Sequence, residues 1–177
     1  MNDATGIEPK FAKAVPAGDD RERDICAHCG FIDYRNPRIV VGSVLAYGNK
    51  ILLCRRAIEP RRGFWTLPAG YLEIGETVED GARREAYEEA RVRPILDRVL
   101  GVYSVPRIAQ VQIMFRGTLD SAECAPGPES LEVGLFAFDE IPWPDIAFPT
   151  VGWALRHWKE SAGLAGFPPF SNPLDGL

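Results

Sequence analysis

The sequence has no apolar run long enough to cross a membrane. A helix that spans a bilayer needs about 20 consecutive apolar residues, and every uninterrupted apolar stretch in the 177 residues is much shorter. Residues 1–24 also lack the apolar core of a secretory signal peptide. We therefore expect a cytoplasmic protein without membrane attachment, in which the four cysteines are reduced thiols.

Positive charge is also scarce. The chain has 20 Lys and Arg against 25 Asp and Glu, which gives a formal net charge of −5. Proteins that bind nucleic acid need clustered positive charge, so we expect no nucleic-acid partner. A polyphosphate ligand would be repelled by the chain as a whole, and metal ions or local arginines would have to neutralise it.

Strand-like and helix-like segments alternate through the middle of the chain. Apolar and β-branched patterns predict strands at 39–47, 50–56, 64–71, 98–105, 109–119 and 131–138. The strand 64–71 should end in a turn at Pro68-Ala69-Gly70, and the alternation in 109–119 puts Gln110 and Gln112 on the polar side of a half-buried strand. Helices are predicted at 78–90, after the N-cap Thr77, and at 148–163. Residues 1–24 are polar and are expected to form an arm or a partly disordered segment. This order predicts a mixed sheet covered by helices, an α/β fold of the α+β type.

One predicted helix carries an unusual concentration of carboxylates. Residues 70–92, GYLEIGETVEDGARREAYEEARV, contain six glutamates. On a helical wheel, Glu85, Glu88 and Glu89 fall within an arc of roughly 100°, at the edge of the apolar face. Clustered carboxylates repel one another, and hard oxygen ligands suit Mg²⁺ or Mn²⁺. A solvated helix surface is the alternative, because glutamates at this spacing are common there.

The spacing in this stretch resembles the Nudix box: glycine, five residues, glutamate, seven residues, Arg-Glu, an apolar residue, any residue, Glu-Glu. The corresponding residues here are Gly70, Glu76, Arg84, Glu85, Ala86, Glu88 and Glu89. Arg91 stands where the family usually has glycine, so we expect an altered helix end but no lost ligand. The resemblance implies a Nudix α/β/α sandwich with a mixed sheet over residues 38–165, followed by an irregular tail at 166–177.

The resemblance also assigns roles around the metal. It implies that the carboxylates of Glu85, Glu88 and Glu89 and the carbonyl of Gly70 bind Mg²⁺ or Mn²⁺, and that Arg84 orients the carboxylates. Nudix enzymes hydrolyse a nucleoside diphosphate linked to another moiety, by attack of a water that metal ions acidify.

The catalytic base is not fixed by the box. Glu129, in GPESLEV, resembles a later-loop glutamate that some ADP-ribose hydrolases use. Glu132 and a helix glutamate are the alternatives, and an ordinary loop carboxylate is an equally good interpretation of Glu129.

The flanking sequences suggest a substrate class. The segments GDDRERDICAHCGFIDYRNPRIVVG, LLCRRAIEPRRGFWTLPAG and GPESLEV resemble a Nudix subgroup with an N-terminal zinc ribbon, some of whose members hydrolyse ADP-ribose and FAD. The resemblance gives these candidate substrate-binding residues: Arg55, Arg56, Arg62, Tyr71 and Pro106. Each also has a plain structural explanation, as solvated charge, core packing or the end of a strand.

Half of the zinc site is missing from the arm, which we assign to residues 1–37. A structural zinc site uses four ligands, typically from two Cys-x-x-Cys pairs. Cys26 and Cys29 form one such pair, and no cysteine precedes them. We therefore do not expect zinc as a cofactor.

These observations favour an enzyme that releases AMP from ADP-ribose or FAD. The alternatives are hydrolysis of NADH, coenzyme A or oxidised nucleoside triphosphates, or a non-catalytic Nudix-like module that senses a ligand. The signature of NADH pyrophosphatases is absent after the box. By family analogy we expect a homodimer.

Overall fold

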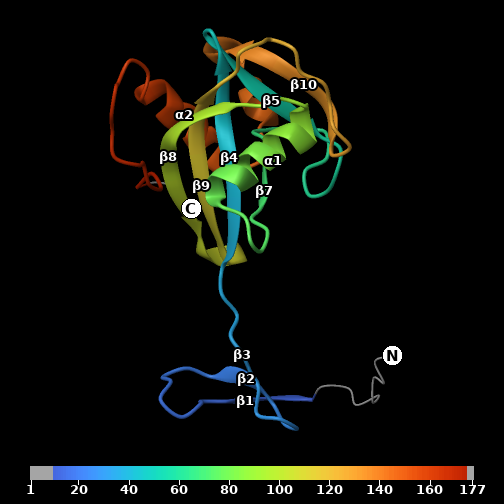
Figure 1. Cartoon of the computed structure of the whole chain (residues 1–177), viewed down its shortest axis with the longest axis vertical. Coiled ribbons are helices and arrows are strands. Elements are labelled where there is room, and N and C mark those ends of the chain that lie inside the picture. The colour runs from blue at the N-terminus through green and yellow to red at the C-terminus, as the bar shows by residue number, and fades with distance from the viewer. Residues whose placement is uncertain (1–9, 175–177) are drawn as a thin grey trace. The chain divides into compact units, whose positions relative to one another are not determined.

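The computed structural model describes residues 10–174, which form two compact units that divide between Asn36 and Pro37 (Figure 1). In the first unit, β1 (Phe11–Ala14), β2 (Arg23–Cys26) and β3 (Ile32–Asp33) form an antiparallel sheet. The expected arm or partly disordered segment is therefore wrong from residue 10 onward, and residues 1–9 lie outside the described part of the chain.

Ion pairs stabilise the first unit where a hydrophobic core would be expected. Among the apolar side chains of residues 10–36, only Cys26 is buried. Arg23 pairs with Asp19 at 2.8 Å, and Arg35 pairs with Asp24 at 3.0 Å. A polar composition therefore does not prevent this segment from forming a sheet, in which Lys13 of β1 also pairs with Asp24 of β2 at 3.2 Å.

The second unit is a seven-stranded mixed sheet with a helix on each face. Its main path runs β10-β5-β4-β9-β8, while β6 pairs with β5 and β7 pairs with β4. Strands β4 and β9 are parallel, and the other neighbours are antiparallel. The strands are β4 (Arg38–Tyr47), β5 (Lys50–Arg56), β6 (Trp65–Thr66), β7 (Ala69–Tyr71), β8 (Ile95–Val105), β9 (Gln110–Thr118) and β10 (Ser130–Ala137). The helices are α1 (Val78–Ala90) and α2 (Pro149–Glu160), with 3-10 turns at Pro106–Ile108, Phe138–Glu140 and Trp143–Asp145.

The predicted mixed sheet with covering helices is confirmed, with one local error. The segment 64–71 was predicted as one strand ending in a turn at Pro68-Ala69-Gly70. Instead it divides into β6 and β7, which pair with different strands, and Ala69–Tyr71 is itself a strand.

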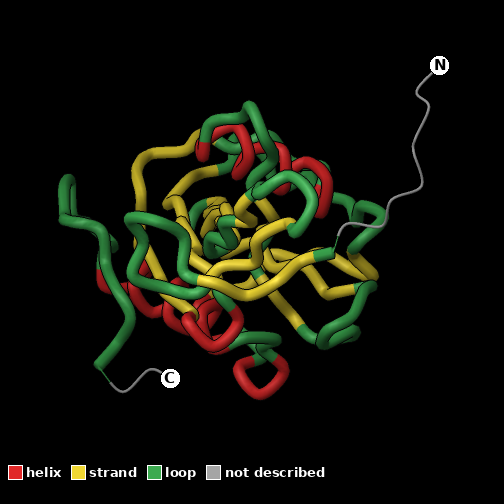
Figure 2. Tube along the Cα trace, turned by 90° about the horizontal axis from the view of Figure 1, so that it is seen from below, coloured by secondary structure: helices red, strands yellow, loops and turns green. Residues whose placement is uncertain are grey.

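Both faces of the central strands are buried. Leu45 and Leu52 pack with Ala86 of α1. Val44 and Ile51, the neighbours of these leucines in sequence, pack with α2 on the opposite face. Because successive side chains alternate across a strand, near-continuous apolar runs in β4 and β5 are what a sheet between two helical layers requires. Figure 2 shows helices on opposite sides of the strands.

Helix α1 begins and ends with defined caps. The side chain of Thr77 accepts a hydrogen bond from the backbone N–H of Asp80 at 3.1 Å. At the other end, Arg91 has φ 58° and ψ 24°, and its N–H donates to the carbonyl of Tyr87. This left-handed conformation is the one that glycine adopts readily. The altered helix end that we expected is therefore not seen, and the arginine carries backbone strain instead.

We predict that Arg91→Gly stabilises the protein. An L-residue in the left-handed region costs about 1–2 kcal/mol, and glycine's greater freedom in the unfolded chain offsets part of the gain. The free energy of unfolding in urea should rise by about 0.5–1 kcal/mol. Arg91→Ala keeps the Cβ atom and should show no gain. An equal gain in both variants would mean that strain is not the cause.

Residues 170–172 cover the edge strand β8. The backbone N–H of Val102 donates to the carbonyl of Phe170 at 2.9 Å, and the N–H of Phe170 donates to the carbonyl of Leu100 at 2.9 Å. The side chain of Asn172 bonds to both backbone groups of Ser104. The segment predicted as an irregular tail thus closes an edge that would otherwise expose unpaired N–H and C=O groups.

Phe170 also stacks on a buried histidine. The rings of His157 and Phe170 lie 4.4 Å apart and 7° from parallel. The Nδ1 atom of His157 lies 2.8 Å from the hydroxyl oxygen of Tyr103. Burial lowers the pKa of His157, and the neighbouring Glu160 charge opposes this only in part. The imidazole is therefore neutral in the folded state at neutral pH.

We predict that His157 makes the fold sensitive to acid. The unfolded chain takes up a proton near the ordinary pKa of 6.5 while the folded chain resists it, so stability falls as pH drops through that value. His157→Gln keeps a hydrogen-bond acceptor but does not titrate. Its free energy of unfolding should fall less than that of the wild type between about pH 7.5 and about pH 5.5. Parallel curves for the two proteins would contradict the assignment.

Candidate active site

A cleft of about 1000 Å³ opens in the second unit, beside the carboxylates of α1. Its walls include β7, α1, the beginning of β4, the polar end of β9, the chain from the end of β5, residues 105–108, the loop before β10 and the beginning of α2. Its lining includes Gly70, Tyr71, Arg84, Glu85, Glu88, Glu89, Glu129, Arg56, Arg38, Gln110, Gln112, Phe148 and Trp153. A cavity of this size matches the volume of small-molecule sites in enzymes.

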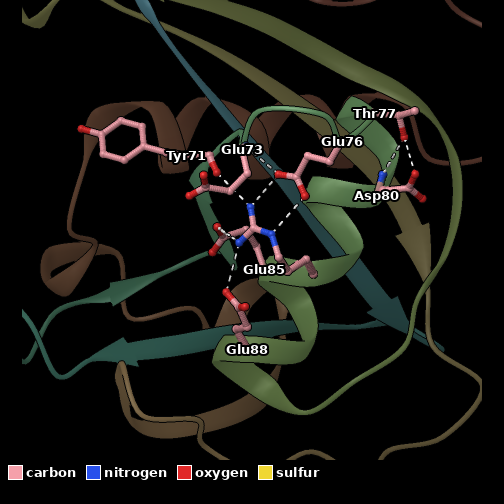
Figure 3. Close-up of polar contacts among 8 residues, drawn as sticks. Tyr71, Glu73, Glu76, Thr77, Asp80, Glu85 and Glu88 are labelled. Atoms are coloured by element: carbon pink, nitrogen blue, oxygen red, sulfur yellow. Dashed lines mark hydrogen bonds and ion pairs between the residues drawn. The ribbon is translucent and has the colours of Figure 1, made fainter. Parts of the chain in front are cut away.

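Arg84 lines the cleft and joins three segments, and Figure 3 shows its partners Tyr71, Glu76, Glu85 and Glu88. Its Nε and Nη2 atoms donate to the two carboxylate oxygens of Glu76 at 3.1 and 2.8 Å. Nη2 also donates to the backbone carbonyl of Tyr71 at 2.9 Å. Nη1 donates to Glu85 at 2.7 Å and to Glu88 at 3.0 Å. One guanidinium therefore fixes β7, the loop before α1 and the acidic face of α1.

The ion pair between Arg84 and Glu76 shifts the pKa values of both groups. The hydrogen bonds from Arg84, together with the backbone N–H of Glu73, lower the pKa of Glu76. The same pairing raises the pKa of Arg84, which stays charged. Glu76 is thus an anion dedicated to holding the arginine, as its position at the end of the box loop suggests.

Two of the three box carboxylates are almost entirely buried. Glu85 is 8% exposed and Glu89 is 6% exposed, while Glu88 is open to solvent. Burial is the main cause that raises the pKa of Glu89 to about 8, and the charge of Glu85 adds to it. Burial also raises the pKa of Glu85, against the opposing effect of Arg84. Buried like charges of this kind call for a cation.

Gly70 lies in direct contact with the carboxylate of Glu85. A Cβ atom at position 70 would collide with the Glu85 carboxylate. The absent side chain therefore leaves the backbone of β7 and the carboxylate in direct proximity. Strand β7, which carries the Gly70 carbonyl, therefore lies against the acidic face of α1. A metal site that uses oxygen atoms from both elements needs this proximity.

The donor set fits a hard divalent cation. It consists of oxygen atoms only, which suits Mg²⁺ or Mn²⁺. Within residues 10–174, no three carboxylate, thiol or imidazole groups already converge on one point, because Glu85 and Glu88 turn toward Arg84. The residues that would hold the ion are Gly70, Glu85, Glu88 and Glu89, and the ion would compete with Arg84 for two of them.

The loop between β9 and β10 completes this region. The N–H of Ala125 donates to the carbonyl of Ala90 at 3.1 Å, and that of Gly127 donates to the carbonyl of Glu89 at 3.0 Å. These bonds satisfy carbonyls in the last turn of α1. They also set Glu129 at the cleft, close enough for its charge to raise the pKa values of Glu85 and Glu89.

The structure brings some of the candidate substrate residues together and leaves others apart. Arg56 and Tyr71 line the cleft, whereas Arg55, Arg62 and Pro106 are exposed elsewhere. Arg55 donates to the carbonyl of Gly63 at 2.9 Å. Since adjacent strand residues point to opposite faces, only one arginine of the pair can face the cleft. Glu132, the alternative base, pairs with Arg55 and is also outside it.

Several residues in the cleft were not identified from the sequence. Gln110 and Gln112 were assigned to the polar side of a half-buried strand, and Phe148 only to the predicted second helix. The alternation in β9 shows which residues share a face, but it does not reveal that this face borders a cleft. One signal in the sequence could have identified the glutamines. A sheet face covered by a helix is shielded from solvent, so two glutamines on such a face indicate that part of it is open.

The first unit offers only half of a zinc site. Backbone N–H groups of Cys29 and His28 lower the pKa of Cys26, and the N–H of Gly30 donates to the Cys26 carbonyl at 2.9 Å. This turn resembles one zinc knuckle, but the described residues supply no third ligand near it. The residues present therefore do not fit a four-ligand zinc ion.

Comparisons with known proteins now decide the family. A family model described as NUDIX domain matches residues 36–157, more than half of the chain. The chain belongs to the Nudix family. A second model, described as Nudix N-terminal and named for a zinc ribbon, matches residues 9–35. No described helix is long and apolar enough to cross a membrane.

Individual relatives agree with this Nudix assignment. The ADP-ribose pyrophosphatase of Methanocaldococcus jannaschii is 34% identical over 113 residues, which cover 62% of this chain and 67% of the relative. The NAD-capped RNA hydrolase NudC of Edwardsiella ictaluri is 29% identical over 147 residues, which cover 81% of this chain and 54% of the relative. The chain thus spans about half the length of NudC.

A solved structure covers nearly the whole chain. The crystal structure of a NUDIX hydrolase from Nitrosomonas europaea is 42% identical, covers 97% of both chains and gives a TM-score of 0.87. The fold described above, including the small N-terminal sheet, is therefore shared with a Nudix hydrolase.

We predict that Glu89→Gln removes metal binding while leaving the fold intact. Losing a ligand should weaken Mg²⁺ or Mn²⁺ affinity by more than about tenfold. Without metal at pH 7, the variant should melt roughly 2–4 °C higher than the wild type. Burial raises the pKa of Glu89 to about 8, so this carboxyl must take up a proton when the chain folds, and a glutamine need not. Thermal melts with and without chelator test both effects.

Glu79→Gln is the matched control, since it makes the same change on the exposed side of α1. It should behave like the wild type in both melts. Equal metal-induced stabilisation of all three proteins would remove Glu89 from the ligand set.

Proposed function

We propose that this Nudix protein hydrolyses the pyrophosphate bond of a nucleoside diphosphate linked to another moiety, with ADP-ribose or FAD as the first candidates and AMP as a product. The observation that supports this best is the set of carboxylates of Glu85, Glu88 and Glu89 around Gly70, at the mouth of a cleft large enough for a dinucleotide. Mg²⁺ or Mn²⁺ bound there would neutralise phosphate charge and acidify the attacking water.

The chain's own residues supply orientation and charge. Arg84 holds the carboxylates in place through Glu76 and Tyr71. Arg56 is fixed by its Nε bond to the carbonyl of Pro60 at 2.8 Å and by the ring of Phe148. The remaining guanidinium N–H groups of Arg56 can donate to phosphate, close enough to Glu89 for the arginine to lower that carboxyl's pKa.

Glu129 is our candidate for the base that deprotonates the water. It is exposed at the cleft, and its loop is hydrogen-bonded to the turn of α1 that carries Glu89. A base must lie within hydrogen-bond reach of the proton that it removes. A helix glutamate stays the alternative.

The substrate assignment has two kinds of support. The relative from Methanocaldococcus jannaschii is named an ADP-ribose pyrophosphatase. The cleft also has two chemically different ends, which suits a substrate with two different halves. Relatives named NAD-capped RNA hydrolase make NADH a specific alternative. Cytoplasmic location, a homodimer and the 1–37, 38–165 and 166–177 division stay predictions.

Product analysis tests the proposal. With Mg²⁺, the protein should release AMP from ADP-ribose or FAD faster than it acts on NADH, coenzyme A or oxidised dGTP. Glu89→Gln provides the blank. Faster release of pyrophosphate from oxidised dGTP would reject the substrate class while keeping the metal site. Absence of turnover with every substrate would favour a ligand-sensing module.

A further inference from the structure

The polar face of β9 is not explained by the core or by the metal site. Gln110, Gln112 and Met114 share one face of the strand, and Met114 packs in the core beside Trp153 and Leu155 of α2. A sheet face that a helix covers normally carries apolar residues. Here two half-buried glutamines occupy its open end and line the cleft.

The two glutamines are part of a hydrogen-bonded chain. The Nε2 of Gln112 donates to the Oε1 of Gln110 at 3.3 Å, and the Nε2 of Gln110 donates to the hydroxyl of Tyr71 at 3.2 Å. The guanidinium of Arg38 covers the Tyr71 ring at 5.0 Å from its centroid. Among the described residues, neither the Oε1 of Gln112 nor the Tyr71 hydroxyl proton has a partner. The chain therefore ends in an open acceptor and an open donor.

The hydrogen-bonded series of Tyr71, Gln110 and Gln112 begins one residue from the candidate metal site. Tyr71 follows Gly70 in β7, and its carbonyl is held by Arg84. Beyond the carboxylates, the other end of the cleft is different, since the Arg56 guanidinium lies 5.2 Å from the centroid of the Phe148 ring. One end thus offers amide and phenol groups beside the Arg38 guanidinium, and the other offers a flat aromatic and guanidinium surface that suits stacking by a base.

We propose that Tyr71, Gln110 and Gln112 form a hydroxyl-binding subsite for the sugar of the non-nucleotide half of the substrate. The proposal rests on the proposed function. Sugar hydroxyls both donate and accept hydrogen bonds, as do the amide and phenol groups of this chain. The nucleobase occupies the Arg56 and Phe148 end. A ligand without those hydroxyls leaves the polar groups of the subsite unpaired, which makes the subsite a specificity determinant.

The test uses the two products of ADP-ribose as separate probes. Gln112→Leu should raise KM for ADP-ribose and the inhibition constant of ribose 5-phosphate by about tenfold each, because one buried hydrogen bond is lost. The inhibition constant of AMP should stay within about twofold, since AMP does not reach the subsite. Thr118→Val, on the exposed end of the same strand, controls for damage to β9.

Each outcome decides the assignment. Weaker AMP inhibition in Gln112→Leu would mean that the amides bind the nucleotide half, and unchanged constants for both products would mean that they bind neither. Either result overturns the proposal. If the protein cleaves no dinucleotide, the proposed function fails, but this result alone does not decide the subsite. Calorimetric titration of the wild type and Gln112→Leu with ribose 5-phosphate and with AMP then tests the subsite without turnover.

Discussion

The ion-pair network of Arg84 is the interaction on which the rest of the site depends. Its guanidinium contacts two carboxylates of α1, the anion of Glu76 and the carbonyl of Tyr71. Without it, three glutamates would meet at the edge of a partly buried helix, where only Arg56 compensates Glu89. The network also registers β7 against α1, so the strand that carries Gly70 and the helix that carries the carboxylates keep a fixed separation.

This arrangement resolves a conflict of charge. A chain of net charge −5 that binds an anionic substrate must concentrate positive charge where the phosphates lie. Several arginines line the cleft; among them, Arg84 is used structurally, whereas Arg56 is held at the cleft with free donors. A metal ion would supply the remainder. The division explains why neighbouring arginines in the sequence are not equivalent.

The sequence predicted the site better where the signals were local. Helix α1 has the predicted bounds because its N-cap and the proline that follows are short-range features. The division of 64–71 into β6 and β7 was not predicted, because each short strand is defined by its pairing with a different strand, β5 or β4. The direction of Arg55 and Arg56, and the cleft-facing role of Gln112, depend on which face of the sheet adjoins open space. Periodicity groups residues onto faces, but the tertiary fold decides what each face meets.

The loop that reaches back to α1 has a consequence for how this architecture can vary. Gly127 lies so close to the carbonyl of Glu88 that a Cβ atom would overlap it, and its N–H bonds to the next carbonyl along. The loop and the end of α1 are therefore fixed relative to each other. Insertions should be tolerated in the exposed stretch 120–123, where nothing is clamped. An added residue between 125 and 129 would shift Glu129 relative to the carboxylates, so loop length in this short span and the end of α1 should evolve together.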